Sequence, residues 1–293
     1  MRKLIMTVVL LTAFVTPAFA DLNVVATLPW IGSLAKELGK DKINVATLVK
    51  PGQDAHMIEA KPSMIFAARK ADAIMYDGLD LEIGYLPLIL ESAKNPALMP
   101  GKAGNFDCSQ FITPLEKPTT VDRSMGDVHP LGNPHYHFSP ARVLRVGEGM
   151  ARVLAELDRV NADFYLANYK AFAQHVKAKE KEWHAASLRG KKFVAYHKYF
   201  EYLADEFGFQ IIGYLEPKPG IPPSAAHIEE LVELMKKEKP DAILATPALG
   251  REEAESLSAK TGVKVIVLPH DAGSLPGTED LISFWDRTVS LLK

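Results

Sequence analysis

Histidines gather in one short stretch of this chain, with a spacing that suits metal binding. The stretch 126–140 holds three of the nine histidines, namely His129, His135 and His137. Three prolines and two glycines in the same stretch argue against a helix or a central strand and predict an ordered loop. Neutral imidazole is the commonest side-chain metal ligand, and rigid loops often carry binding groups. The alternative is a polar turn whose histidines are solvated.

Within this loop, two histidines stand two positions apart. If the backbone is extended there, His135 and His137 point to the same side and could bind one ion together. If Ser139 instead caps a helix that begins at Pro140, His137 belongs to the packing beneath that helix. We favour His135 as a ligand and His137 as a supporting or packed residue. The role of His129 is left open.

Three more candidate ligands follow predicted strands elsewhere in the chain. They are His56, His197 and Asp271, and His270 could serve in place of its neighbour Asp271. Open α/β sheets bind ligands at the carboxyl ends of their strands. Three imidazoles and one carboxylate would form a closed tetrahedral set for a borderline divalent ion. The pattern predicts a cleft between two lobes, with one ion held by both.

Alternating strand and helix patterns predict an α/β protein with two lobes, each a small, mostly parallel sheet flanked by helices. The strands are expected at residues 22–28, 43–49, 73–76, 193–196, 210–215, 242–245 and 263–268. The helices are expected at residues 30–38, 62–70, 199–207, 225–238, 251–261 and 278–292. Residues 21–293 are also many for a single hydrophobic core, which favours two domains.

A long helical pattern between the halves predicts a rigid connector. It runs from about residue 161 to about residue 186 without glycine or proline, and Gly190 follows as a stop. At 1.5 Å per residue it would span roughly 35–40 Å. We therefore expect an N-terminal lobe at 21–158, a linking helix at 159–188 and a C-terminal lobe at 189–293. An ordinary surface helix is the alternative.

The N-terminus predicts export. Arg2 and Lys3 precede an apolar run at 4–15, and small residues end at Ala20, which is typical of a signal peptide at residues 1–20. Its cleavage would leave a soluble periplasmic protein. Without Arg2 and Lys3 the formal net charge changes from −2 to about −4, which argues against nucleic acid as a partner. A single cysteine, Cys108, excludes an internal disulfide and a cysteine-rich zinc site.

Taken together, these motifs resemble the periplasmic solute-binding proteins of metal ABC transporters, in the zinc and manganese group with a rigid inter-domain helix. The matching segments cover nearly all of residues 21–293 and are 51–56 with 61–63, 77–82, 129–135, 196–203 and 270–274. The resemblance implies that His56, His135, His197 and Asp271 bind the metal. Manganese-binding members carry Glu at the third position, so His197 implies zinc, which also fits ligand softness.

Two departures from the family pattern concern histidines. The second motif usually reads His-x-Trp-Leu-Asp-Pro, whereas this chain has His135-Tyr-His137-Phe-Ser-Pro. Many zinc members also carry a histidine- and acid-rich loop, but the matching region here, about 115–128, is short and has no histidine. Zinc capture would then use that loop differently or depend on a separate periplasmic metallochaperone.

The resemblance implies high-affinity capture of Zn²⁺ as the transported ligand and its delivery to a membrane ABC permease by a monomeric, non-enzymatic protein. One rival is a zinc-dependent hydrolase, with Asp54 or Glu59 as general base. A catalytic site needs an open coordination position, which four protein ligands do not leave, and the chain has no His-Glu-x-x-His helix. The other rival is a manganese-binding or adhesin member of the same family.

Overall fold

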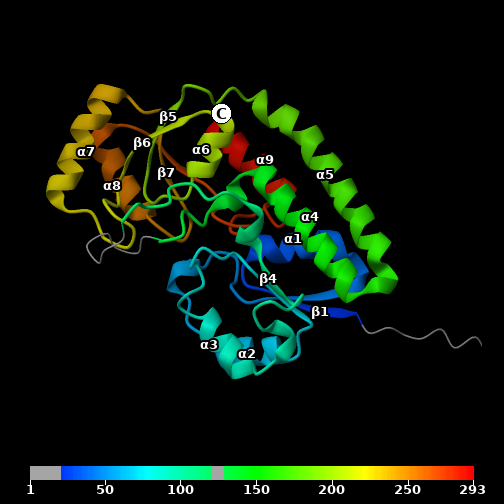
Figure 1. Ribbon diagram of the computed structural model, residues 1–293. Helices are drawn as coiled ribbons and strands as arrows, with labels where there is room; N and C mark the ends of the chain where they lie inside the picture. The colour runs from blue at the N-terminus through cyan, green and yellow to red at the C-terminus, as the bar shows by residue number, and fades with distance from the viewer. Residues whose placement is uncertain (1–20, 121–128) are drawn as a thin grey trace, which may run out of the picture.

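A computed structural model describes residues 21–120 and 129–293 of the chain. The expected signal peptide, residues 1–20, lies outside the described residues, as does part of the loop at 115–128. Within the described part, two parallel sheets lie in separate halves of the molecule (Figure 1). The predicted two-lobe α/β architecture is confirmed.

The first sheet has four parallel strands in the order β2-β1-β3-β4. These strands are β1 (Leu22–Ala26), β2 (Ile43–Thr47), β3 (Ala73–Tyr76) and β4 (Asn105–Asp107). The helices of this half are α1 (Pro29–Gly39), α2 (Pro62–Arg69) and α3 (Leu86–Ala93). Val24 of the central strand pairs with Val45 and Ala73 on its two sides. The β-branched residues favour the strand, and burial of the sheet explains its nearly continuous apolar sequence.

The second sheet repeats this arrangement, with the strand order β6-β5-β7-β8 and all pairs parallel. Its strands are β5 (Lys192–Ala195), β6 (Gln210–Tyr214), β7 (Ala242–Ala245) and β8 (Val265–Val267). The helices that follow along the chain are α6 (Glu201–Phe207), α7 (Ala225–Glu238), α8 (Arg251–Thr261) and α9 (Leu281–Leu292). Because both sheets have the same strand order, their carboxyl ends are equivalent places to mount ligands.

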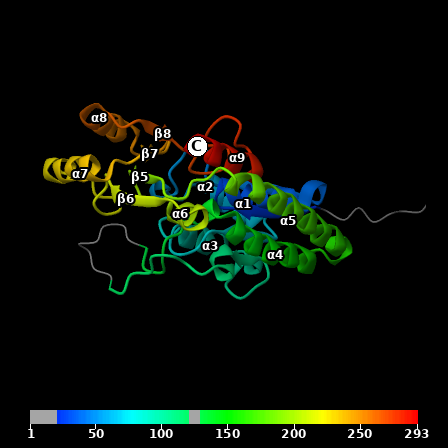
Figure 2. The same cartoon turned by 90° about the horizontal axis from the view of Figure 1, so that it is seen from above.

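The long helix between the sheets is α5 (Ala162–His184), 23 residues in length. It runs along one side of the molecule next to α4 (Pro140–Leu157) (Figures 1 and 2). Asn168 donates a hydrogen bond to the Leu38 carbonyl at the end of α1, and the Trp183 indole donates one to Asp286 of α9. The helix is therefore anchored to elements on both sides of the molecule. The lobe boundaries at 158 and 188 stay a prediction.

Three elements of the structure have no predicted range: α4, β4 and α3. Helix α4 contains Gly147 and Gly149, which lower helix propensity. A side chain at Gly149 would lie 2.3 Å from the Phe111 ring, so close packing explains the glycine. Strand β4 has three residues, one of them buried, and α3 has eight residues, so both are short.

The buried core is continuous between the two sheets. Among its largest fully buried side chains, Trp30 comes from α1, Phe200 precedes α6, and Phe284 and Trp285 come from α9. The two halves therefore share apolar packing as well as the α5 connection. No helix in the described ranges is long and apolar enough to cross a membrane.

Candidate metal centre

Three predicted ligands meet in the structure. His56, His135 and His197 each offer a ring nitrogen within 4.8 Å of the others. Among the described residues, these three form the group of possible metal ligands that lie this close together. Their ring centroids lie 5.3, 5.3 and 5.5 Å apart. Three imidazoles around one tetrahedral ion, with metal–nitrogen bonds of about 2.0–2.1 Å, would have centroids roughly 5.2 Å apart. The cluster is therefore spaced to hold one ion.

The local backbone structure fixes where the ring of each of these histidines points. His56 lies on a short 3₁₀ turn (Ala55–Met57) beyond β2, and the Asp54 side chain accepts a hydrogen bond from its backbone N–H. His197 lies just past β5. The backbone N–H of His135 donates to the Asn133 side chain at 2.9 Å. These local bonds place rings from both halves of the molecule on one cluster.

Two carboxylates set the tautomers of two histidines. Nδ1 of His56 lies 2.6 Å from Asp54 Oδ1, and Nδ1 of His197 lies 2.6 Å from Glu216 Oε2. Because each carboxylate accepts from Nδ1–H, Nε2 keeps its lone pair for a metal ion. Burial alone would raise the pKa of Asp54, but its bonds with His56 outweigh burial and lower that pKa to about 2. Asp54 is therefore an anion that orients His56.

His135 presents a buried nitrogen with no partner. Its Nε2 has no hydrogen bond among the described residues. Burial, followed by the nearby charges of His56 and His197, holds the pKa of His135 well below its usual range, so the ring stays neutral. An unpaired buried polar atom costs about 1–3 kcal/mol. A metal ion at the centre of the cluster would satisfy it.

Asp271, the fourth predicted ligand, lies beside the cluster but outside the group of three. Its carboxylate accepts the Ala272 backbone N–H at 2.6 Å and the backbone N–H of Trp30, at the start of α1. Burial raises the pKa of Asp271 to about 8, against the opposing effect of these bonds. A void of about 20 Å³ is lined by Asp271, His56 and His135. That volume is about the space that one water molecule or ion needs.

A buried acidic pair, Asp77 and Glu82, supports the start of α1, where Asp271 accepts the Trp30 backbone N–H. The Trp30 indole donates to Asp77, and Glu82 accepts from the Thr27 hydroxyl at 2.6 Å and from the Asp77 backbone N–H at 2.7 Å. Burial raises the pKa of Glu82 to about 7 and that of Asp77 well above its usual range. The 77–82 segment therefore holds the first turn of α1 in place.

His137 packs beside the cluster and lines the same void as His56, His135 and Asp271, but it is not one of the three grouped histidines. Its Nε2–H donates to the His270 carbonyl at 2.8 Å, and its ring stacks on Trp30 with centroids 6.0 Å apart. Ser139 caps α4 by accepting a hydrogen bond from the Arg142 backbone N–H. This is the arrangement in which His137 was expected to pack beneath the helix. His270 in turn has Nε2 3.3 Å from the Gln53 carbonyl. These two histidines connect loops of the two halves.

Replacing His137 with alanine is expected to destabilise the fold and leave zinc binding intact. The substitution removes a fully buried ring and the hydrogen bond to the His270 carbonyl. We expect a loss of about 3 kcal/mol in the free energy of unfolding of the metal-free protein, measured by denaturant titration. Zinc stoichiometry in the folded variant should stay at one. Loss of that zinc would make His137 a ligand.

His129 also reaches the cluster. Its Nε2 lies 3.2 Å from Nε2 of His56, and the ring centroids are 5.3 Å apart. Burial, then the nearby charges of His56 and His197, lower the pKa of His129 to about 3, against a backbone hydrogen bond with Leu79. Like His135, it is a neutral imidazole at ordinary pH.

Two contributors to the centre had no assigned role in the sequence. Glu216 is 19 positions from His197, so no local motif connects the two residues. The Tyr199 ring lies 4.3 Å from His135 and 4.8 Å from His197, measured between centroids. The sequence predicted that Tyr199 begins a helix at 199–207. The buried ring instead forms one wall of the cluster.

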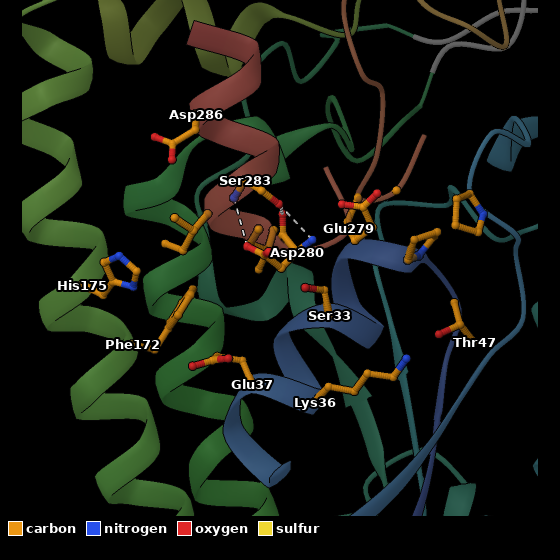
Figure 3. A pocket seen from close by; sticks show the side chains of 16 residues that line it. Ser33, Lys36, Glu37, Thr47, Phe172, His175, Glu279, Asp280, Ser283 and Asp286 are labelled. Atoms are coloured by element: carbon orange, nitrogen blue, oxygen red, sulfur yellow. Dashed lines mark hydrogen bonds between the residues drawn. The ribbon is translucent and has the colours of Figure 1, made fainter. Parts of the chain in front are cut away.

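A cavity larger than the void beside Asp271 lies between α1, α5 and α9 (Figure 3). Its volume is about 760 Å³, and Ala272 and Gly273 line it just behind Asp271. The acidic side chains in this cavity have other partners. Asp280 caps α9, Glu37 pairs with Lys40 at 2.6 Å, and Asp286 accepts from the Trp183 indole. We therefore place the metal chemistry at the histidine cluster.

Comparisons with known proteins agree with the fold. The family described as zinc-uptake complex component A, periplasmic, matches residues 24–293. The iron-binding protein YfeA of Yersinia pestis is 26% identical over 282 residues, covering 92% of this chain and 85% of YfeA. The zinc-binding lipoprotein AdcA of Streptococcus pneumoniae is 25% identical, covering 94% of this chain and 56% of AdcA.

A crystal structure of ZnuA has the same fold, with a TM-score of 0.76 and 24% identity over 93% of this chain and 98% of that one. The architecture and the histidine cluster thus define a periplasmic metal-binding component of an ABC transporter. The chain belongs to the zinc-uptake complex component A family.

Proposed function

We propose that this protein captures Zn²⁺ with His56, His135, His197 and Asp271 and delivers it to the permease of its ABC transporter. The observation that carries the proposal is the three-histidine cluster. Carboxylates set the tautomers of His56 and His197, which leaves their Nε2 atoms free to bind a metal ion. The Nε2 atom of His135 is buried without a hydrogen-bond partner. Asp271 would complete the set from the adjoining void.

The donor set favours zinc over manganese. Three imidazole nitrogens and one carboxylate are the ligands of a closed tetrahedral zinc site, whereas manganese prefers more oxygen ligands. The related proteins carry both kinds of name, since AdcA is called zinc-binding and YfeA iron-binding. The choice of metal therefore depends on this chain's own ligands.

Ligands from both halves of the molecule suit capture and release of cargo. His56 follows a strand of the first sheet, whereas His197 and Asp271 follow strands of the second. Separating the halves would break the set, so contact with a permease could release the ion. Export by the N-terminal signal peptide, a monomeric state and an optional zinc metallochaperone complete this proposal.

Competitive titration tests the choice of metal. Protein stripped with a chelator is titrated with Zn²⁺ and with Mn²⁺ against an indicator of known affinity. The expected result is one Zn²⁺ per chain and an affinity for Zn²⁺ at least 100-fold above that for Mn²⁺, which follows the order of metal affinities for nitrogen sites. Equal affinities, or no zinc binding, would reject the proposal.

Replacing Glu216 with glutamine is expected to weaken zinc binding about 10- to 100-fold, because it removes the anion that orients His197. Isothermal titration with a competing chelator would measure the change. Glu255→Gln is the matched control, since Glu255 is an exposed residue of α8 that pairs with Arg251. The same loss in both variants would show that Glu216 has no specific role.

A further inference from the structure

A second cavity opens onto the cluster, and Asp271 is not among the residues that line it. Its volume is about 190 Å³, and its lining includes Glu116, His129, Asn133, His135, His197 and Lys198. His135 also lines the 20 Å³ void in which Asp271 lies. We call the two spaces the outer cavity and the inner void. His129 lines the outer cavity and Asp271 the inner void, so the two residues approach the cluster from different spaces.

The distance between His129 and His56 suits a shared ion. Two nitrogens bound to one tetrahedral zinc ion, each at about 2.0–2.1 Å, lie roughly 3.3 Å apart. The two Nε2 atoms are 3.2 Å apart in the structure. Asp54 accepts from Nδ1–H of His56, so Nε2 of His56 presents a lone pair toward His129. In the metal-free protein the direction of this contact depends on the tautomer of His129, and an ion could take the place of the proton between the two nitrogens.

Polar contacts between the two halves of the chain border the outer cavity. Glu116 pairs with Lys198, and the Asn133 side chain donates to Glu116 at 3.1 Å and to the Lys198 carbonyl at 2.9 Å. These contacts connect Glu116 and Asn133 with the start of the second half of the chain. The outer cavity is therefore bordered by both halves, as the inner site is.

From this arrangement we propose that His129 is a transfer ligand, which binds incoming Zn²⁺ together with His56 where the outer cavity meets the cluster. The ion then moves inward as Asp271 replaces His129. His56 stays bound throughout, because its Nε2 faces both His129 and the three-histidine cluster. This inference rests on the proposed function and adds an intermediate to it.

An intermediate on the binding path affects the rates of both zinc association and zinc dissociation. Exchange of one ligand for another avoids a state in which the ion has lost its water and has too few protein ligands. Loss of His129 should therefore slow association and dissociation together, and change the equilibrium affinity less than either rate. A permanent ligand would behave differently, since its loss mainly speeds dissociation and weakens affinity.

The test is stopped-flow mixing of Zn²⁺ with chelator-stripped full-length protein, followed by release into excess chelator. We expect His129→Ala to slow both rates at least tenfold. His175→Ala is the matched control, because His175 is an exposed histidine on α5 that lines the large cavity instead. His135→Ala provides the behaviour of a permanent ligand.

Three outcomes separate the possibilities. Slowed association and dissociation in His129→Ala, with unchanged rates in His175→Ala, would support the transfer role. Unchanged rates in His129→Ala, or an affinity loss as large as that of His135→Ala, would overturn it. Failure of the wild-type protein to bind Zn²⁺ would instead reject the proposed function itself.

Discussion

Alanine at position 197 is expected to weaken zinc binding by about 100-fold or more, with the fold kept. His197 supplies one of the three clustered nitrogens, and its removal also leaves Glu216 as a buried anion without its main partner. Loss of a hydrogen-bond partner behind a ligand already costs 10- to 100-fold in affinity, so loss of the ligand should cost at least as much. Chelator competition measures the affinity, and circular dichroism checks the fold.

The matched control for this variant is His184→Ala. His184 is an exposed histidine at the end of α5, where its ring contacts Phe207. Its substitution should leave the zinc affinity unchanged. If the affinity is unchanged in His197→Ala as well, His197 is not a ligand. The proposed site would then have one ligand fewer from the second half of the molecule.

Zinc binding at pH 7 is expected to release about one proton per ion from Asp271. Burial raises the pKa of this carboxyl to about 8, so below pH 8 the metal-free side chain is mostly protonated. A metal ion binds the deprotonated form and therefore displaces the proton. Affinity should rise with pH up to about 8, and the proton release should fall toward zero above that pH. Calorimetry in buffers of different ionisation enthalpy measures the release.

Asp271→Asn tests the source of that proton. Asparagine keeps the size of the side chain and removes both its charge and its proton. We expect zinc affinity to fall by about 10- to 100-fold and the proton release at pH 7 to disappear. Equal proton release in the wild-type protein and the variant would contradict the assignment of Asp271 as a ligand.

Several elements were predicted with the bounds that the structure has. They include the strand at Ala73–Tyr76 and the helices at Ala225–Glu238 and Arg251–Thr261. Helix α4 received no predicted range, although its buried apolar residues recur with a helical period, because Gly147 and Gly149 lower helix propensity. The Phe111 ring explains Gly149, since a side chain there would collide with it. That requirement is set by tertiary packing, which a single helix's sequence does not contain.

The three histidines of the site were predictable, because imidazole is a common metal ligand and these residues lie in loops, two of them after strands. His56, His135 and His197 come together as expected, because the carboxyl ends of the two sheets face one cluster. The carboxylates behind them depend on contacts between distant segments, as the His197–Glu216 pair shows. The same holds for the contact of His129 with His56, whose residues lie 73 positions apart.

The most direct test of a zinc site shared by both halves is a crystal structure of the zinc-loaded protein with anomalous data at the zinc edge. We expect one zinc peak bonded at about 2.0–2.2 Å to His56, His135, His197 and Asp271. An ion bound by residues of only one half, or bound with His129 permanently in place of Asp271, would contradict that assignment.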